Sequence, residues 1–301
     1  MTKTALPGLH HVTAISGPPQ ANVDFFTKVL GQRLVKKTVN FDDPGTYHLY
    51  YGNHTADPGT ILTFFPFVGA GPGAPGAGMA EAYAYATGDF DDWTRQVREA
   101  GITVETPQER FGARVATLRD PDGAAVELVE VAGAGSPAEG GFHSVTLAEA
   151  DLEPTQRLMT DILGYEEVGH EQSDGRERLR LRAPGDARGA VLDLVRTQSR
   201  GHSGAGTIHH VAFRAEDDET QLAWREKLLS EGYQVTPVID RQYFNAIYFR
   251  EPGGVLFEIA TDPPGFTRDE PLEHLGEALK LPEKYEGMRD RIEAALPPIA
   301  A

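Results

Sequence analysis

Apolar and polar positions follow helical spacing in four separate segments of the chain, and each of these segments ends at a glycine. The four segments are residues 18–31, 89–101, 153–164 and 217–232. In the first segment, Val23, Phe26, Val29 and Leu30 fall on one face of a helix. The following Gly31 can take the left-handed conformation that commonly ends a helix. The pattern therefore predicts four short amphipathic helices.

Short segments of β-type residues stand before and after each predicted helix, and the last segment of each set begins at a turn glycine. These last segments are residues 59–63, 123–127, 189–193 and 254–258. The residue four positions after the glycine is Thr63, Glu127, Asp193 and Glu258, respectively. The pattern therefore indicates four copies of one unit that contains a strand, a helix and further strands.

Three stretches rich in Gly, Pro and Ser separate these units, at residues 69–78, 132–141 and 200–206. We expect an N-terminal pair of units in residues 1–133 (1–68 and 79–133), a C-terminal pair in residues 140–262 (140–198 and 206–262), and a C-terminal extension in residues 263–301. Such a unit has a helix on one sheet face and must bury its other surface against a second copy. The predicted fold is α+β, with four βαβββ modules that form two curved-sheet cups.

Histidines recur in the first strands of these units, in "LHHVT", "FHSVT" and "IHHVA". Successive side chains of a strand point to opposite faces. Aligning the three valines puts His10, His143 and His209 on one face, and His11, Ser144 and His210 on the other. The last strands add Thr63 to the first unit, Glu127 to the second, Asp193 to the third and Glu258 to the fourth.

Only a pairing of the first unit with the fourth brings two imidazoles and one carboxylate into a single cup, from His11, His210 and Glu258. This ligand set leaves open positions on the metal, as in the facial triad of non-heme iron(II) oxygenases. We therefore predict that the first module pairs with the fourth around a metal, and that the second and third form a scaffold without one. Two alternatives stay open: a ligand set of His143, His210 and Glu258, and a fold that holds no metal.

The charge and composition narrow the range of functions. The chain has 301 residues, a net charge of −17 and no cysteine. A large acidic excess disfavours binding to nucleic acid or to an anionic membrane. Without cysteine, any metal must be held by nitrogen and oxygen ligands. No apolar run approaches the ~20 residues of a membrane helix, and the N-terminus lacks a signal-like apolar segment, so we expect a cytoplasmic protein.

The segments "LHHVT", "IHHVAF", "DRQYF" and "IYFREPGGVLFEIATDPPGFTRDE" identify a resemblance that covers most of the chain. The sequence resembles the hydroquinone-type ring-cleaving dioxygenases of the vicinal oxygen chelate (glyoxalase/bleomycin resistance/dioxygenase) superfamily, and it is similar to dichlorohydroquinone 1,2-dioxygenases. The resemblance implies an Fe(II) enzyme that uses O2 as cosubstrate to open the ring of a small aromatic diol, a hydroquinone with or without substituents. Manganese, nickel or zinc can occupy the same kind of site.

Matching the family motifs residue by residue implies the roles of eight side chains. The metal ligands would be His11, His210 and Glu258, and the residues around them would be His10, His209, Thr13, Arg241 and Tyr248. Arg241 and Tyr248 would line the substrate pocket. For His48, on a strand of the first unit, a place in the lining of the pocket is one interpretation, but packing in the core or at its rim is the favoured one. A homodimer or a higher homo-oligomer is a further expectation.

The same superfamily includes other functions, so fold alone does not settle the activity. A metal-dependent isomerase or lyase of the glyoxalase type usually has an additional glutamate ligand, but Thr63 stands at that position of the first unit. A small-molecule-binding resistance module would lack the triad. Both remain alternatives to the dioxygenase.

Overall fold

A computed structural model describes residues 5–300, and within them the named strands form two eight-stranded sheets. The first sheet contains β1 (Leu9–Ser16), β2 (Arg33–Val39), β3 (Tyr47–Gly52), β4 (Ile61–Pro66), β13 (Thr207–Ala215), β14 (Ile239–Asp240), β15 (Phe244–Arg250) and β16 (Leu256–Pro264). The second contains β5 (Met79–Thr87), β6 (Gln108–Arg110), β7 (Ala113–Arg119), β8 (Ala125–Glu130), β9 (Phe142–Glu149), β10 (Glu166–Ser173), β11 (Arg176–Arg182) and β12 (Val191–Arg196).

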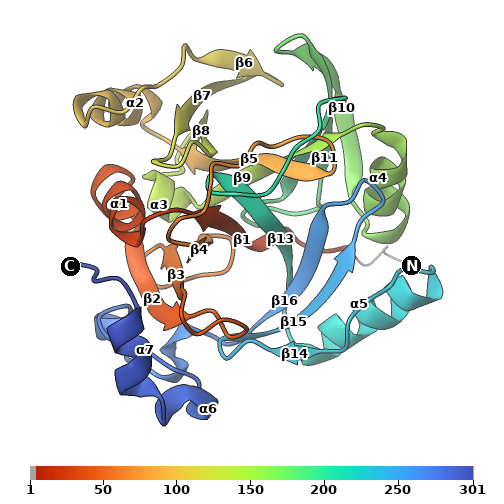
Figure 1. Cartoon of the computed structure of the whole chain (residues 1–301). Helices are drawn as coiled ribbons and strands as arrows, with labels where there is room; N and C mark the ends of the chain where they lie inside the picture. The colour runs from red at the N-terminus through yellow and green to blue at the C-terminus, as the bar shows by residue number, and fades with distance from the viewer. Residues whose placement is uncertain (1–4, 301) are drawn as a thin grey trace.

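The order of strands shows how the four units combine. The first sheet runs β14-β15-β16-β13-β1-β4-β3-β2, so it joins the first unit to the fourth through the antiparallel pair β1 and β13. The second sheet joins the second unit to the third through β5 and β9. In Figure 1 these four strands, two from each sheet, lie in the middle of the molecule. The predicted α+β fold with two cups, and the pairing of the first module with the fourth, are confirmed.

A buried apolar face fixes the register of the central strands. Val12, Val211 and Phe257 lie next in sequence to His11, His210 and Glu258, and each is 0% exposed. A slip of one residue would turn all of these apolar side chains away from the core, so the register is strongly determined. Packing on one face of the sheet therefore forces the alternate residues to face the cup.

Helices lie on the outside of the sheets (Figure 1). They are α1 (Pro19–Asp24), α2 (Phe90–Glu99), α3 (Pro137–Gly140), α4 (Glu153–Arg157), α5 (Asp218–Ser230), α6 (Glu283–Glu286) and α7 (Arg289–Ala295). The four glycines predicted to end helices, Gly31, Gly101, Gly164 and Gly232, all have φ between 67° and 89°. Across residues 5–300, no helix is both long enough and apolar enough to span a membrane.

Two of the four predicted helices differ from the expectation in their second half. After α1 and α4 the chain makes one turn of π-helix, at Phe25–Val29 and Leu158–Ile162. The wider turn lets two successive large side chains face the core. Phe25 is 3% exposed and Phe26 is 0% exposed. The helical spacing of apolar residues had put only Phe26 of this pair on the buried face.

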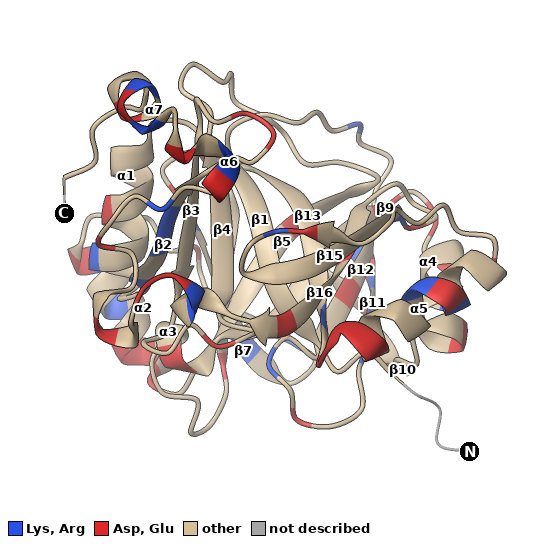
Figure 2. Ribbon diagram, turned by 90° about the horizontal axis from the view of Figure 1, so that it is seen from below, with Lys and Arg blue, Asp and Glu red and all other residues tan. Residues whose placement is uncertain are grey.

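The C-terminal extension crosses the edge of the first sheet. Leu279 forms a parallel bridge with Lys37 of β2. The buried ammonium group of Lys36 lies 2.6 Å from a carboxylate oxygen of Asp269 and 2.5 Å from one of Glu270. In Figure 2 the charged residues are concentrated on the outer helices and loops, whereas most strands carry few of them. Lys36 and these two carboxylates thus form a charged contact between β2 and the C-terminal extension.

Candidate metal centre and its cavity

Three strands of the first sheet present the predicted metal ligands to one point. His11 lies on β1, His210 on β13 and Glu258 on β16, and these strands are neighbours in the order β16-β13-β1. Across the ladders, Ala212 pairs with both His11 and Glu258. His11 and Glu258 therefore stand on opposite sides of Ala212, and the small side chain of Ala212 leaves space between them.

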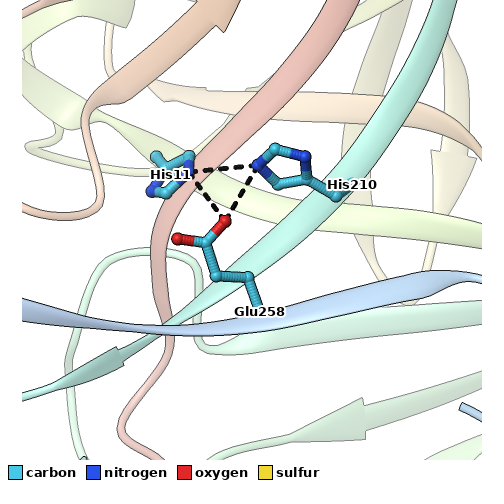
Figure 3. Close-up of side chains that lie close together, drawn as sticks. All are labelled: His11, His210 and Glu258. Carbon is cyan, nitrogen blue, oxygen red and sulfur yellow. Dashed lines mark hydrogen bonds and ion pairs between the residues drawn. The ribbon is translucent and has the colours of Figure 1, made fainter. Parts of the chain in front are cut away.

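The ligand atoms of this group converge, as Figure 3 shows. Nε2 of His210 lies 3.0 Å from Oε2 of Glu258, and Nε2 of His11 lies 3.5 Å from the same oxygen. The two Nε2 atoms are 3.3 Å apart. All three residues are buried, and each offers one ligand atom within 4.8 Å of the others. Within residues 5–300 this is the one group of His, Asp and Glu found with such an arrangement.

The state of the carboxylate favours a cation at this point. Glu258 is 0% exposed, and neither of its oxygens accepts a hydrogen bond of good geometry from the described residues. A buried carboxylate without such partners is costly. Burial alone would raise the pKa of Glu258, but the interactions with His11 and His210 lower its pKa well below the usual value. An ionised carboxylate beside two imidazoles fits a divalent metal with nitrogen and oxygen ligands.

The first histidine of each pair contacts the second in the same way. Nδ1 of His10 lies 2.9 Å from Nδ1 of His11, and Nδ1 of His209 lies 2.8 Å from Nδ1 of His210. Burial lowers the pKa of His10 to about 3 and that of His209 to about 4. Neutral imidazoles at these positions can accept a hydrogen bond at Nδ1 from the Nδ1–H of the second histidine, which leaves Nε2 of the second histidine free to bind a metal.

A cavity of about 370 Å³ opens beside the triad. Of the eight side chains singled out from the sequence, His11, His209, His210, Arg241 and Tyr248 line it. The other three, His10, Thr13 and Glu258, do not line it and are at most 2% exposed. The sequence prediction therefore combined residues at the cavity surface with residues that lie behind it.

Arg241 and Tyr248 form a pair at the edge of this cavity. Nε of Arg241 donates a hydrogen bond to the hydroxyl of Tyr248 at 3.1 Å, and the guanidinium lies over the Tyr248 ring. Tyr248 is the cross-strand partner of Glu258. Burial raises the pKa of the Tyr248 hydroxyl well above its usual value. Its oxygen accepts from Arg241, and its hydroxyl also interacts with the Glu258 carboxylate, which adds to the rise in pKa.

The sequence prediction missed several aromatic and polar residues of the cavity. His48 was expected in the core or at its rim, but it lines the cavity together with Tyr50. Phe244 also lines it, with its ring centroid 4.9 Å from that of His11. A signal for the first two was present, because Tyr50 pairs with Thr63 across the ladder and His48 lies two residues away on the same face of β3. Phe244 precedes the regular part of β15 and had no such signal.

The corresponding positions of the second sheet carry different chemistry. Asp193 accepts hydrogen bonds from Arg180 at 2.8 Å and from Arg178 at 3.0 Å, so its charge is already neutralised by guanidinium groups. Glu127 is paired with Arg110 at 2.6 Å. His143 lies on β9, in the other sheet from His210 and Glu258, and Nδ1 of its ring contacts the hydroxyl of Ser144. The alternative ligand set that includes His143 is therefore not brought together.

Comparison with known proteins identifies the family. The model of the Glyoxalase/Bleomycin resistance protein/Dioxygenase superfamily matches residues 8–128 and 141–259. The chain belongs to this superfamily. The protein is 48% identical over 305 residues to a Bacillus subtilis (strain 168) protein named as ring-cleaving dioxygenase MhqO, covering 97% of this chain and 96% of the relative. It is 36% identical over 309 residues to the chlorohydroquinone/hydroquinone 1,2-dioxygenase of Sphingobium indicum, and the match covers 95% of this chain and 94% of that relative.

Solved structures agree with this assignment. A crystal structure of a protein described as a dioxygenase, from Bacillus subtilis subsp. subtilis str. 168, superposes with a TM-score of 0.92 at 47% identity. The match covers 99% of this chain and 98% of that protein. Glyoxalase I from Zea mays superposes with a TM-score of 0.65 at 17% identity, and the match covers 85% of this chain and 92% of that protein. At this low identity, the similarity shows only that the two proteins share a fold. The resemblance inferred from the sequence, and the expectation of a ring-cleaving dioxygenase enzyme of this superfamily, are confirmed.

Proposed function

We propose that the protein is a non-heme Fe(II)-dependent, extradiol-type ring-cleaving dioxygenase that acts on hydroquinones, with O2 as cosubstrate. The observation that carries the proposal is the buried group of His11, His210 and Glu258 beside a cavity with aromatic walls. The relative named as a chlorohydroquinone/hydroquinone 1,2-dioxygenase supports the substrate class. The substrate would be a small aromatic diol, and the proposed location is the cytoplasm.

His11, His210 and Glu258 would hold the metal through two Nε2 atoms and a carboxylate oxygen. When bound, Fe(II) would supply open positions at which a diol and O2 can be held together. His10 and His209 would fix the protonation of the two ligand imidazoles through the Nδ1 contacts, because such outer partners orient the ligands and tune their basicity. Manganese, nickel or zinc could occupy the same set.

The residues of the cavity would orient the substrate ring and its oxygens. Phe41, Phe65 and Phe67 give the cavity an apolar aromatic wall against which a ring can pack. Tyr248 would donate its hydroxyl proton to a substrate oxygen. Arg241 would strengthen this donor and stabilise negative charge that develops on oxygen during the reaction. Thr13 does not line the cavity, so it would act through its hydrogen bond with Thr63 and not by contact with the substrate.

Oxygen uptake tests this proposal directly. The protein, loaded anaerobically with Fe(II), is mixed with 2-methylhydroquinone, catechol or the hemithioacetal of methylglyoxal and glutathione. We expect uptake with the hydroquinone and its loss in the variant His11→Ala. The matched control is His143→Ala, which removes a histidine near the equivalent position of the other sheet and should keep the activity.

The other outcomes discriminate among the alternatives. Uptake with catechol alone would keep a dioxygenase but reject the hydroquinone preference. Consumption of the hemithioacetal without oxygen uptake would instead support a glyoxalase-type isomerase. Uptake that persists in His11→Ala would contradict the proposed ligand set.

A further inference from the structure

Four polar side chains of the first unit form a continuous hydrogen-bonded chain beside the triad. The hydroxyls of Thr13 and Thr63 are 2.9 Å apart, and the Thr63 hydroxyl lies 2.8 Å from Nε2 of His48. Nδ1 of the same imidazole lies 2.8 Å from the hydroxyl of Tyr50. Thr63 stands at the position of the first unit that corresponds to Glu258 of the fourth. This series of hydrogen bonds thus occupies the position at which a glyoxalase-type site has an additional carboxylate.

The direction of the chain follows from its two ends. Thr13 is 0% exposed and does not line the cavity, and its hydroxyl has no partner other than Thr63 among the described residues. A buried hydroxyl proton without an acceptor is costly, so Thr13 must donate to Thr63. Thr63 then donates to Nε2 of His48. The imidazole consequently carries its proton on Nδ1 and donates it to the oxygen of Tyr50.

The last proton of the chain therefore lies on Tyr50, which lines the cavity. Phe266 and Tyr243 pack against the Tyr50 ring, with centroids 5.3 Å and 6.0 Å away, and hold the ring in place. Because the Tyr50 oxygen accepts from His48, its own proton is free for an acceptor in the cavity. Burial raises the pKa of Tyr50 well above its usual value, so the hydroxyl remains protonated and acts as a donor.

We infer that Tyr50 is a further substrate-binding residue, and that Thr13, Thr63 and His48 are positioning residues that direct its hydroxyl proton to the diol oxygen that is not held at the metal. This inference rests on the proposed function, because it assigns the second hydroxyl of a hydroquinone to a specific donor. It also means that His48 is not a general base, since both of its ring nitrogens are engaged in the chain.

A comparison of two ligands tests the role of Tyr50 without turnover. Under anaerobic conditions, calorimetry of the metal-loaded protein measures the dissociation constants of hydroquinone and of phenol, which lacks the second hydroxyl. We expect the wild type to bind hydroquinone about tenfold more tightly than phenol, as one hydrogen bond would give. In Tyr50→Phe this preference should vanish while phenol binding is unchanged. An unchanged preference for hydroquinone in Tyr50→Phe would overturn the inference.

The positioning residues require a separate comparison. Thr63→Val removes both hydrogen bonds of Thr63 and should reduce the preference for hydroquinone, whereas Thr63→Ser should retain it. The control is Thr38→Val, because Thr38 is also fully buried in the first unit but its hydroxyl has no partner among the described residues. Equal losses in Thr63→Val and Thr38→Val would indicate a general packing effect and would reject the positioning role.

The protonation of His48 gives a readout that does not depend on activity. Nitrogen NMR of the histidine-labelled, zinc-loaded protein identifies the His48 signals by their absence in His48→Asn. We expect the His48 proton on Nδ1. A proton on Nε2 would mean that the hydrogen bonds run in the opposite direction, and it would overturn the inference. If no hydroquinone supports oxygen uptake, the proposed function fails, but the ligand comparison and the NMR spectrum still decide the role of Tyr50.

Discussion

At the scale of single residues, the candidate centre depends on alternation along three strands. Each side chain of the triad follows or precedes a fully buried apolar residue, so the core and the centre are specified by the same short segments. This is why strand parity could predict that His11, His210 and Glu258 meet. It could not predict how the outer histidines are bonded, because the contact between Nδ1 atoms depends on side-chain rotation and on burial.

Glu258→Gln should weaken metal binding sharply while the fold is kept. The amide has nearly the shape of the carboxylate but removes the negative charge that a divalent cation requires. We expect the dissociation constant for Fe(II) or Mn(II) to rise about 100-fold, on the order seen when a metal site loses important partners. Competition with a chelator under anaerobic conditions measures it, and His143→Ala serves as the control. Wild-type affinity in Glu258→Gln would exclude this carboxylate as a ligand.

Tyr248→Phe should lower kcat and leave metal binding unchanged. The variant removes the hydroxyl to which Arg241 donates but keeps the aromatic ring. The loss of one donor to a developing charge predicts a decrease of about 100-fold to 1,000-fold. The control is Arg250→Lys at the end of the same strand, where the guanidinium binds a backbone carbonyl away from the cavity. Steady-state oxygen uptake gives kcat, and equal rates for Tyr248→Phe and the wild type would contradict the role of the hydroxyl.

At the scale of elements, glycine positions and apolar spacing predicted where helices end but not how their last turns are wound. Positive φ angles at Gly31, Gly101, Gly164 and Gly232 follow from a local requirement that the sequence displays directly. The π-helical turns at Phe25–Val29 and Leu158–Ile162 arise because two adjacent large residues are both buried, which only tertiary packing decides. The cavity residues His48 and Tyr50 carried a partial signal, because they share one face of β3, but their pairing with Thr63 depends on the strand order of the folded sheet.

Lys36→Ala should destabilise the protein through the contact between β2 and the C-terminal extension. Lys36 is fully buried, and its removal would leave Asp269 and Glu270 without their cation. Breaking a buried pair in this way predicts a loss of about 3–5 kcal/mol in the free energy of unfolding. Lys28→Ala breaks an exposed pair with Asp24 and should cost less than about 1 kcal/mol. Urea unfolding measures both, and similar values for the two variants would argue against the extension as a stabilising element.

At the scale of the whole molecule, the two sheets meet at a pair of acidic residues. Glu149 ends β9 of the second sheet, and Glu251 follows β15 of the first. Both oxygens of Glu149 are buried without a hydrogen-bond partner among the described residues. Burial, and then the charge of Glu251, raise the pKa of Glu149 to about 8. The folded protein therefore holds a proton at this position that the unfolded chain, with an ordinary carboxyl pKa, releases at neutral pH.

The sign of the pH dependence follows from this raised pKa. The folded state binds the additional proton, so stability from this group is fully present below the ordinary carboxyl pKa, is lost as the pH rises toward about 8, and changes little above that. The loss should be on the order of a few kcal/mol. Glu149→Gln should remove this dependence and stabilise the protein at pH 9. Urea unfolding at pH 5 and pH 9 measures the change in the free energy of unfolding, with the exposed Glu153→Gln as control. An equal loss of stability between these pH values in Glu149→Gln and the wild type would refute the prediction.

The assembly of the first sheet from the two ends of the sequence has a consequence for biosynthesis. His11 emerges from the ribosome early, but its partners His210 and Glu258 follow only after the intervening units have been made, because the two histidines are 199 positions apart in the sequence. The second and third units are adjacent in sequence and can fold against each other first, since contacts between near neighbours form at a lower entropic cost. Chains that end before Glu258 therefore cannot bring His11, His210 and Glu258 together, and capture of a metal by this group would have to wait until the fourth unit has been made.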